Sequence, residues 1–361
     1  MRLTGRSLLK PQDAQRASQC GGMRSVSQTQ RRIIPRWLWV HSATVSSLAC
    51  LCVLLAVAVP DDILMQPLDI GTGERLLVIA PHPDDETLGA AGLLQRVLAY
   101  GGQARIMVLT AGDGYIEAVQ HATGHLVPRP AAYLAYGERR LKELRAAVRR
   151  LGDHRIRLQV LGFPDGGLAP LLEAHWQRTH PERSSTTEAS HPPYPEVLAP
   201  DLAYDGADLL RELEQVLHES QPTLVAFPDP LDRHPDHRAT GLLTLLALRH
   251  WRPQAPALPR LLAYLVHWPN WPPGWDTPPL SSPTIETGLT FPPDLPTRGL
   301  VRRALRLTDA ESALQRTALL LHASQQAVMP SFLASFICRS EPFTEFTAAE
   351  VQRVAPLIHH R

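Results

Sequence analysis

Cysteine is scarce in this 361-residue chain, which contains only four. Cys20 lies in a basic N-terminal tail, Cys50 and Cys52 lie in an apolar run, and Cys338 alone belongs to the rest of the chain. A single cysteine excludes both a disulfide framework and a cysteine-ligated zinc site from that part of the protein. Cys338 is therefore expected to be a small buried apolar residue.

The chain also lacks a large excess of charge of either sign, because its formal net charge is +1 at pH 7. Its basic side chains gather at the N-terminus, where residues 1–36 carry eight Lys or Arg residues against Asp13. The remainder is mildly acidic. Neutralising phosphates requires a basic face, so the composition excludes nucleic acid as a partner.

One long apolar run is present, at residues 37–59, and it contains no Asp, Glu, Lys or Arg. As a helix it would be about 34 Å long, which is enough to cross a bilayer core. Three arginines precede it within residues 31–36, and Asp61 and Asp62 follow it. This charge bias predicts a single-pass anchor in the cytoplasmic membrane, with the tail 1–36 in the cytoplasm and the rest periplasmic or extracellular.

Two other interpretations of this run stay open. The small residues "AVA" at 56–58 are typical of a signal-peptide cleavage site, and cleavage there would release a secreted protein. A buried core helix is the other possibility, although apolarity on every side and flanking charges favour a membrane segment. Residues 60–74 are interpreted as a linker to the domain at 75–350.

Apolar strand-like runs alternate with amphipathic helical stretches through the domain. This alternation predicts an α/β fold, with a Rossmann-like, mainly parallel sheet and helices on both faces. Thirty-four prolines in the chain, clustered at about 169–200 and 252–298, predict two long surface inserts. The strands are expected at 75–80, 104–110, 156–163, 223–229 and 260–268, and the helices at 86–100, 137–152, 206–220 and 237–251.

Polar side chains, whose burial costs free energy, follow two of these strands directly. The first strand ends at "HPDDE" (82–86), and the strand 223–229 is followed by "DPLDRHPDHRA" (229–239). The carboxyl ends of parallel strands form the ligand crevice of such folds. His82 and Asp85 can converge on one ion across the turn at Pro83, and a histidine from the second motif would complete a three-ligand zinc site. Each histidine taken alone is more simply explained as solvated or capping a helix.

These motifs resemble those of a known family. "PHPDDETLGAAG" (81–92) and "DRHPDHRA" (232–239) are similar to the two signature motifs of the LmbE/PIG-L family of zinc-dependent N-acetylglucosaminyl deacetylases and related amidases. The resemblance extends over about residues 75–345. Smaller landmarks match as well: "LTAGDG" (109–114), "RLKE" (140–143), "LGFPDGGL" (161–168) and "HASQ" (322–325).

The resemblance implies a cofactor, Zn²⁺, and the residues that bind it. His82, Asp85 and His237 would be the metal ligands. Asp84, next to a ligand, would be the general base that takes a proton from water. The reaction implied is hydrolysis of an acetamide on a sugar.

The resemblance also implies roles for the surrounding residues. His234 would stabilise the oxyanion or assist the leaving amine, and Asp236 would orient a histidine. Arg140 and Asp165 fall where the family contacts sugar hydroxyls, although an ion pair on a helix surface and a turn aspartate explain them equally simply. His267, in "YLVHWPNW" (264–271), is a further candidate for substrate contact or else a buried strand histidine.

The sequence therefore predicts a membrane-anchored, zinc-dependent deacetylase acting on an N-acetylated sugar, glycan or glycolipid. An amidase for a different amide is one alternative. A non-catalytic, zinc-containing glycan-binding module is another, which the intact Asp84 disfavours because a binding module needs no base. A metal phosphoesterase would require more bridging carboxylates than this ligand set provides.

Overall fold

The computed structural model describes residues 65–251, 258–276, 288–296 and 299–354. The basic tail and the apolar run 37–59 lie outside these residues, so the membrane anchor stays a prediction. Among the helices of the described ranges, none is both long and apolar enough to cross a membrane.

Eight strands form one sheet in the described part of the chain: β1 (Gln66–Pro67), β2 (Arg75–Ala80), β3 (Gln103–Thr110), β4 (Ile156–Phe163), β5 (Leu224–Pro228), β6 (Arg260–Tyr264), β7 (Val301–Arg306) and β8 (Ser340–Phe346). Their spatial order is β1-β7-β8-β6-β5-β2-β3-β4. All neighbours pair in parallel except β8, which runs antiparallel to both β6 and β7. The predicted mainly parallel sheet is confirmed, with an antiparallel strand that was not predicted.

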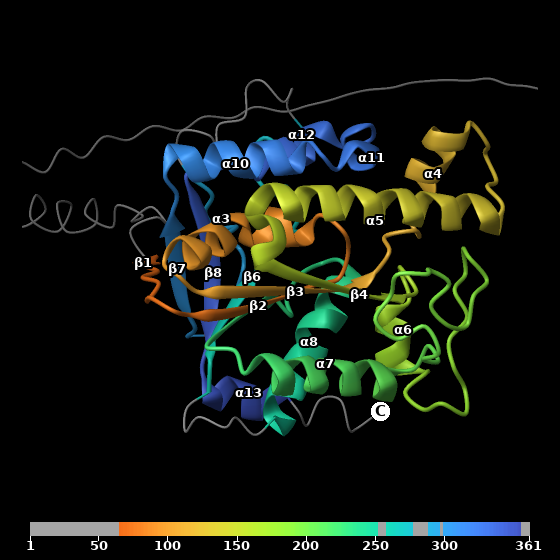
Figure 1. Cartoon of the computed structure of the whole chain (residues 1–361), viewed down its shortest axis with the longest axis horizontal. Coiled ribbons are helices and arrows are strands. Elements are labelled where there is room, and N and C mark those ends of the chain that lie inside the picture. The colour runs from red at the N-terminus through yellow and green to blue at the C-terminus, as the bar shows by residue number, and fades with distance from the viewer. Residues whose placement is uncertain (1–64, 252–257, 277–287, 297–298, 355–361) are drawn as a thin grey trace, which may run out of the picture. The chain divides into compact units, whose positions relative to one another are not determined.

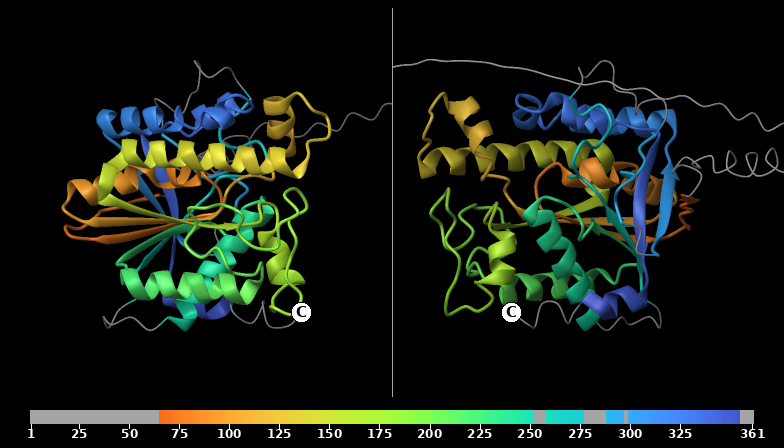
Figure 2. Two further views of the ribbon diagram at one scale, coloured as in Figure 1. Left: turned by 45° about the vertical axis from the view of Figure 1, so that its right-hand side comes forward. Right: turned by 180° about the vertical axis from the view of Figure 1, so that it is seen from behind.

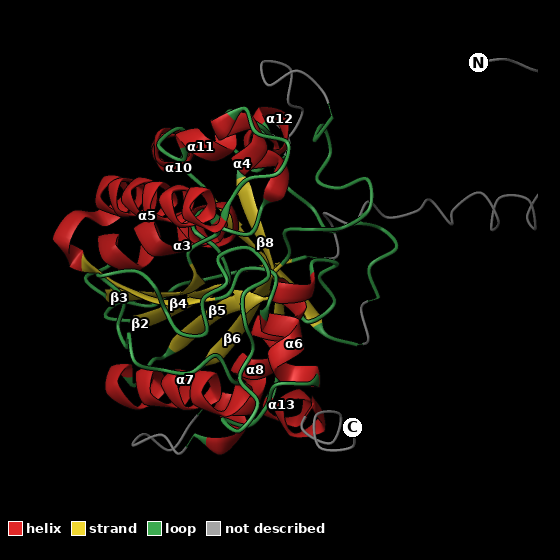
Figure 3. Ribbon diagram, turned by 90° about the vertical axis from the view of Figure 1, so that its right-hand side faces the viewer, coloured by secondary structure: helices red, strands yellow, loops and turns green. Residues whose placement is uncertain are grey.

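Helices cover both faces of this sheet, as the fold class predicted (Figures 1 and 3). One layer contains α3 (Asp85–Ala99), α5 (Pro130–Gly152), α10 (Asp309–Leu319), α11 (Ala323–Gln326) and α12 (Pro330–Ser335). The opposite layer contains α7 (Gly206–Ser220), α8 (Pro235–His250) and α13 (Ala348–Val354). Both views in Figure 2 keep α10 and α5 on the same side of the sheet. The short elements α4 (Ile116–Thr123), η1 (Asp153–Arg155) and α6 (Leu168–Glu173) lie in connections.

The buried apolar run of β2 explains its place in the middle of the sheet. Leu76 and Val78 belong to the core on one face, whereas Leu77 and Ile79 belong to the core on the other. Alternate side chains of a strand point to opposite faces, so a strand buried on both sides is apolar throughout. Apolar runs made β2 and β4 predictable, and an amphipathic helical pattern made α7 predictable, with the bounds that the structure gives them.

Two predicted bounds are wrong by more than two residues, and the bounds of the other predicted strands and helices agree with the structure to within two residues. The helix predicted at 137–152 begins earlier, at Pro130, because proline fits the first turn and Tyr133 adds a buried side chain there. The strand predicted at 260–268 ends at Tyr264, because the next backbone N–H groups of Val266 and His267 bond to a carboxylate, that of Asp232, instead of to a strand.

A buried glutamate of β8 holds the helix that follows β2. Ala90 has non-helical dihedral angles (φ −149°, ψ 17°), so α3 is broken in the middle and the N–H groups after the break lack helical acceptors. The Glu341 carboxylate accepts the N–H of Gly92 at 2.6 Å and that of Leu93 at 3.0 Å. Burial nevertheless raises the pKa of Glu341 to about 7, although these two bonds oppose the shift.

Replacing Glu341 with alanine is expected to lower the free energy of unfolding by about 2–4 kcal/mol, because two N–H groups lose a charged acceptor inside the core. The raised pKa also predicts a pH dependence. The unfolded state releases its proton near the ordinary pKa of 4.5, and the folded state only near 7, so this group's contribution to stability falls as pH rises through that window.

Urea denaturation of the protein and of Glu341→Gln at pH 5 and pH 7 tests this. The fall in stability between the two pH values should be smaller in the variant than in the original protein. An equal fall in both would show that Glu341 does not titrate in this range.

Candidate metal centre

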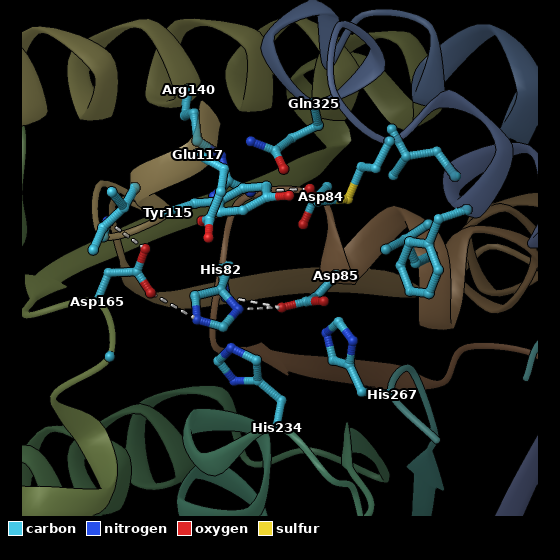
Figure 4. A pocket seen from close by; sticks show the side chains of 17 residues that line it. His82, Asp84, Asp85, Tyr115, Glu117, Arg140, Asp165, His234, His267 and Gln325 are labelled. Carbon is cyan, nitrogen blue, oxygen red and sulfur yellow. Dashed lines mark hydrogen bonds and ion pairs between the residues drawn. The ribbon is translucent and has the colours of Figure 1, made fainter. Parts of the chain in front are cut away.

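A cavity of about 400 Å³ opens where the carboxyl ends of the parallel strands meet. Seven of its lining residues are predicted site residues: three follow β2, one is on α5, and one each follows β4, β5 and β6 (Figure 4). They are His82, Asp84, Asp85, Arg140, Asp165, His234 and His267. The other two predicted residues, Asp236 and His237, are fully buried directly behind this lining.

The first motif forms a closed turn between β2 and α3. The Asp85 carboxylate accepts the backbone N–H of His82 at 3.0 Å, and the Asp85 N–H donates to the His82 carbonyl at 3.3 Å. Asp85 is also the first residue of α3, where a negative charge is favoured by the helix dipole. The turn therefore fixes two candidate ligands on one short segment.

The second motif is organised by Asp232, which is buried after β5. One of its oxygens accepts the N–H of His234 at 2.9 Å, and the other accepts those of Val266 and His267 at 2.9 and 3.0 Å. His234 then caps α8 by accepting the N–H of Asp236 on Nδ1, at 3.3 Å. This arrangement places His237 in the first turn of α8, facing the first motif.

The structure brings His82, Asp85 and His237 together. Asp85 Oδ2 lies 3.2 Å from His82 Nδ1 and 3.2 Å from His237 Nε2. Attraction to the two histidines holds the pKa of the Asp85 carboxyl well below its usual range, against the effect of burial. Both ring nitrogens of His237 are buried and lie close to carboxylates, Nε2 near Asp85 and Nδ1 3.4 Å from Asp232 Oδ2, but neither makes a well-aligned hydrogen bond. A buried imidazole beside a carboxylate and a second imidazole suits a divalent metal, and these are the donor atoms that zinc prefers.

Within the described residues, two sets of side chains bring possible ligand atoms within 4.8 Å of one another, and neither set is the predicted trio. One replaces Asp85 with His234, and the other joins His82 to Asp165 and Asp236. The carboxylates of the second set already accept hydrogen bonds from the backbone. Asp236 accepts the N–H groups of Gly166 and Leu168, and Asp165 accepts that of Gly114. Hydrogen-bonded carboxylates of this kind fit a supporting role around the ligands.

Asp84 occupies a strained position between the turn and α3. Its φ of 123° is unusual for a residue other than glycine, and such strain is concentrated at functional sites. Arg140 fixes this conformation: its guanidinium donates to Asp84 Oδ2 at 2.9 Å and to the Pro83 carbonyl at 2.6 Å. Gly112 adopts a left-handed conformation that leaves room for the guanidinium and turns its carbonyl toward it, at 2.9 Å. Arg140 therefore holds Asp84, a function that the sequence did not predict.

Burial raises the pKa of Asp84 to about 6. The positive charge of Arg140 opposes the shift, and the neighbouring charges of Asp85 and Glu86 add to it. A carboxylate with this pKa is mostly ionised at pH 7 and is still basic enough to accept a proton.

The remaining predicted residues surround His82 and the cavity. His82 Nε2 lies 3.1 Å from Asp165 Oδ1 and 3.3 Å from Asp236 Oδ2. Burial, aided by the positive charges of the neighbouring histidines, lowers the pKa of His234 to about 4 and that of His267 to about 3. Both imidazoles are therefore neutral at pH 7. The structure places all nine predicted residues in one cluster, and their individual roles stay predictions.

A supporting pair that the sequence did not predict lies behind Asp84. Glu86 is fully buried, and its carboxylate accepts the Asp84 N–H at 3.0 Å and the Thr87 hydroxyl at 2.6 Å. His322 Nε2 lies 3.6 Å from the same carboxylate. The last letter of "HPDDE" and the first of "HASQ" were the available signals, but only the fold shows that these residues meet.

Part of this chain matches a family of known proteins. Residues 77–248 match the family PIG-L, described as GlcNAc-PI de-N-acetylase. The fold and the His/Asp cluster define an α/β protein with a candidate metal centre at the carboxyl edge of its sheet. This match covers a little less than half of the chain, so over residues 77–248 the chain is similar to the PIG-L (LmbE-like) deacetylase family.

Individual relatives agree with this assignment. The chain is 31% identical over 183 residues to 1D-myo-inositol 2-acetamido-2-deoxy-alpha-D-glucopyranoside deacetylase 1 of Saccharopolyspora erythraea, covering 48% of this chain and 53% of the relative. It is 30% identical over 214 residues to the deacetylase with the same substrate name from Mycobacterium sp. (strain KMS), covering 58% and 60%. The chain thus spans little more than half the length of these curated relatives.

Among solved structures, the N,N'-diacetylchitobiose deacetylase from Pyrococcus horikoshii is 19% identical and covers 76% of this chain and 84% of its own, with a TM-score of 0.44.

Removing either His237 or Asp85 is expected to weaken zinc binding by more than about tenfold, because each provides one of three protein ligands. Zinc content after dialysis, measured by elemental analysis, tests this for His237→Ala and Asp85→Ala. His154→Ala, which changes an exposed histidine outside the cluster, is the matched control. Full zinc content in either ligand variant would contradict the assignment of that residue.

Proposed function

We propose that this protein is a metal-dependent hydrolase that removes the N-acetyl group from an N-acetylglucosamine-type sugar. The observation that carries the proposal is the joint placement of Asp84 and the trio His82, Asp85 and His237 on one cavity or directly behind it. The family match and the names of the curated relatives, which are deacetylases of a 2-acetamido sugar, support the choice of substrate.

The metal would be held by His82, Asp85 and His237. Zinc bound there would supply Lewis-acid chemistry, polarising a carbonyl and making water more acidic. Asp84 would accept the proton of the attacking water, and its fixed conformation keeps its carboxylate on the cavity. Arg140 and Glu86 hold that conformation from behind, through the side chain and the backbone N–H respectively.

The neutral His234 would act on the other side of the reacting carbonyl. Its ring lies 4.9 Å from that of His82, centroid to centroid, and it lines the cavity. A neutral imidazole can donate a hydrogen bond to a developing oxyanion or to the departing amine, and the proton that Asp84 accepts from water would pass to that amine as it leaves. Asp236 would orient His82, since its carboxylate lies within 3.3 Å of the imidazole and is held by two backbone N–H groups.

Asp165 and His267 would contact the sugar. Asp165 is held by the Gly114 N–H at 2.6 Å, and attraction to His82 keeps the pKa of its carboxyl below the usual range against the effect of burial. An ionised carboxylate on the cavity wall is a suitable acceptor for sugar hydroxyls. Asp165 would therefore face hydroxyls of the substrate, with His267 on the opposite wall.

Two alternative functions make different predictions. An amidase for another amide would use the same residues on a substrate without an acetyl group. A non-catalytic glycan-binding module would bind sugars but would have no need for Asp84. The first is tested by screening acyl groups, and the second by the variant described next.

Asp84→Asn is expected to keep its metal and to lose activity by roughly 10²–10⁴-fold, the usual contribution of a positioned general base. Acetate release from N-acetylglucosamine oligosaccharides and lipid-linked sugars provides the measurement, with zinc content determined on the same samples. Asp201→Asn, at an exposed aspartate, is the matched control and should match the original protein. Loss of zinc from Asp84→Asn would instead make Asp84 a ligand and reverse the roles given to the two aspartates.

We also propose that residues 37–59 anchor the protein and that the domain lies outside the cytoplasm. The basic tail before the run and the acidic residues after it support this orientation. A reporter that fluoresces only in the cytoplasm, fused to Arg361, should stay dark in intact cells. The same reporter fused after Arg36, with the run deleted, should fluoresce. A bright full-length fusion would invert the orientation, and a soluble protein beginning near Val59 would replace the anchor with a signal peptide.

A further inference from the structure

A buried tyrosine in the connection between α6 and α7 contacts a segment at the edge of the reaction cavity. This connection, residues 174–205, overlaps the proline-rich insert that the sequence predicted to lie on the surface. Tyr194 is nevertheless only 3% exposed and belongs to the core on one face of the sheet. Its hydroxyl donates a hydrogen bond to Asp113 Oδ2. Burial raises the pKa of the Tyr194 phenol, so the hydroxyl keeps its proton and is the donor.

A glycine of α5 leaves room for this hydroxyl. Gly137 lies in the interior of the helix, where glycine is less favourable than alanine. A β-carbon at this position would overlap the Tyr194 hydroxyl and would lie only 3.0 Å from Asp113 Cβ. The glycine therefore lowers the helix propensity of α5 but permits the contact between the tyrosine and the aspartate.

The Asp113 carboxyl depends on the tyrosine for its hydrogen bonding. It is 3% exposed, and among the described residues its second oxygen, Oδ1, has no hydrogen-bond partner. Burial raises the pKa of Asp113 to about 7, the charge of Asp165 adds to the shift, and the Tyr194 hydroxyl opposes it. A buried polar group without its partner costs free energy, so loss of the hydroxyl would favour movement of the segment that carries Asp113.

The backbone of this segment, residues 112–114, holds two charged side chains of the reaction cavity. The Gly112 carbonyl accepts a hydrogen bond from the Arg140 guanidinium at 2.9 Å. The Gly114 N–H donates to Asp165 Oδ2 at 2.6 Å, and Gly114 itself lines the cavity. Arg140 and Asp165 both lie on the cavity wall (Figure 4). A shift of the segment would therefore displace both of them.

We propose that Tyr194 is a positioning residue of the reaction centre, which holds the segment 112–114 in the conformation that the reaction requires. It acts through Arg140, which fixes the proposed base Asp84, and through Asp165, the proposed sugar contact. This inference rests on the proposed function and adds to it a residue from outside the two signature motifs.

Amide hydrogen exchange tests the positioning without relying on activity. In Tyr194→Phe, which keeps the buried ring, the Gly114 N–H should exchange at least about tenfold faster, because the segment that carries it is less firmly held. Mass spectrometry of overlapping peptides that resolve Gly114 provides the measurement. Tyr204→Phe is the matched control, because Tyr204 is a second buried tyrosine of the same connection and donates to the Gly162 carbonyl at 2.9 Å. This control should leave exchange at Gly114 unchanged.

Acetate release from N-acetylglucosamine oligosaccharides then tests the consequence for the reaction. In Tyr194→Phe, kcat/KM should fall by about 10- to 100-fold, the usual effect of misplacing a positioned group by about 1 Å. Both constants should change, because Arg140 acts on the base and Asp165 on the sugar. A merely structural role would reduce the amount of folded protein, which lowers kcat and leaves KM unchanged, and that result would overturn the inference.

Two further variants place the effect in this contact. Gly137→Ala puts a methyl group where the hydroxyl lies, so it should reproduce the faster exchange and the lower kcat/KM although alanine favours the helix. Tyr194→Phe combined with Asp113→Ala should have the same kcat/KM as Asp113→Ala alone, within about twofold, because the tyrosine acts through that carboxyl. Losses that multiply in the double variant would contradict this.

The exchange and activity measurements separate the two proposals. Unchanged exchange at Gly114 in Tyr194→Phe would overturn the inference and leave the proposed function standing. Faster exchange with unchanged kcat/KM would also overturn it, because the reaction would then not depend on the segment. Faster exchange, in a protein that releases no acetate from any sugar even in its original form, would overturn the proposed function and retain Tyr194 as the residue that holds this segment.

Discussion

Burial of opposite charges at the meeting point of two strand ends is the constraint on which this structure depends. His82 and Asp85 follow β2, His237 follows β5, and their side chains have almost no access to water. Burying an isolated charge costs too much free energy, whereas opposite charges that are paired and also make further hydrogen bonds can remain buried. Burial of the charges of either motif therefore requires the two parallel strands to be adjacent and in register, as β2 and β5 are.

The same requirement extends outward through the residues around the cluster. Arg140, on α5, neutralises Asp84 and reaches two backbone carbonyls, so the helix layer on that face is tied to the turn after β2. Asp236, at the start of α8 on the opposite face, is tied to the loop after β4 by two backbone N–H groups. The centre thus couples both helical layers to the sheet, and its geometry is set by backbone that the fold already fixes.

The sequence was informative where local pattern and final environment agree. Strand β2 is apolar at nearly every position because both of its faces are buried, and the motifs after β2 and β5 stand out because polar residues follow such strands directly. Strand β7 gave no comparable signal: it carries three arginines in six residues and is half-buried, and its pairing with β8 and β1 makes it a strand. The contacts of Arg140 and the meeting of Glu86 with His322 depend on long-range approach, which no local pattern contains.

Glu341 connects two parts of the domain that are far apart in the sequence and are therefore synthesised at different times. Strand β8 is the last strand of the described residues, yet the carboxylate of its Glu341 completes the helix that begins with Asp85. During synthesis, the first motif emerges long before this acceptor is available. The second half of α3 therefore lacks its buried acceptor until nearly the whole domain has been made.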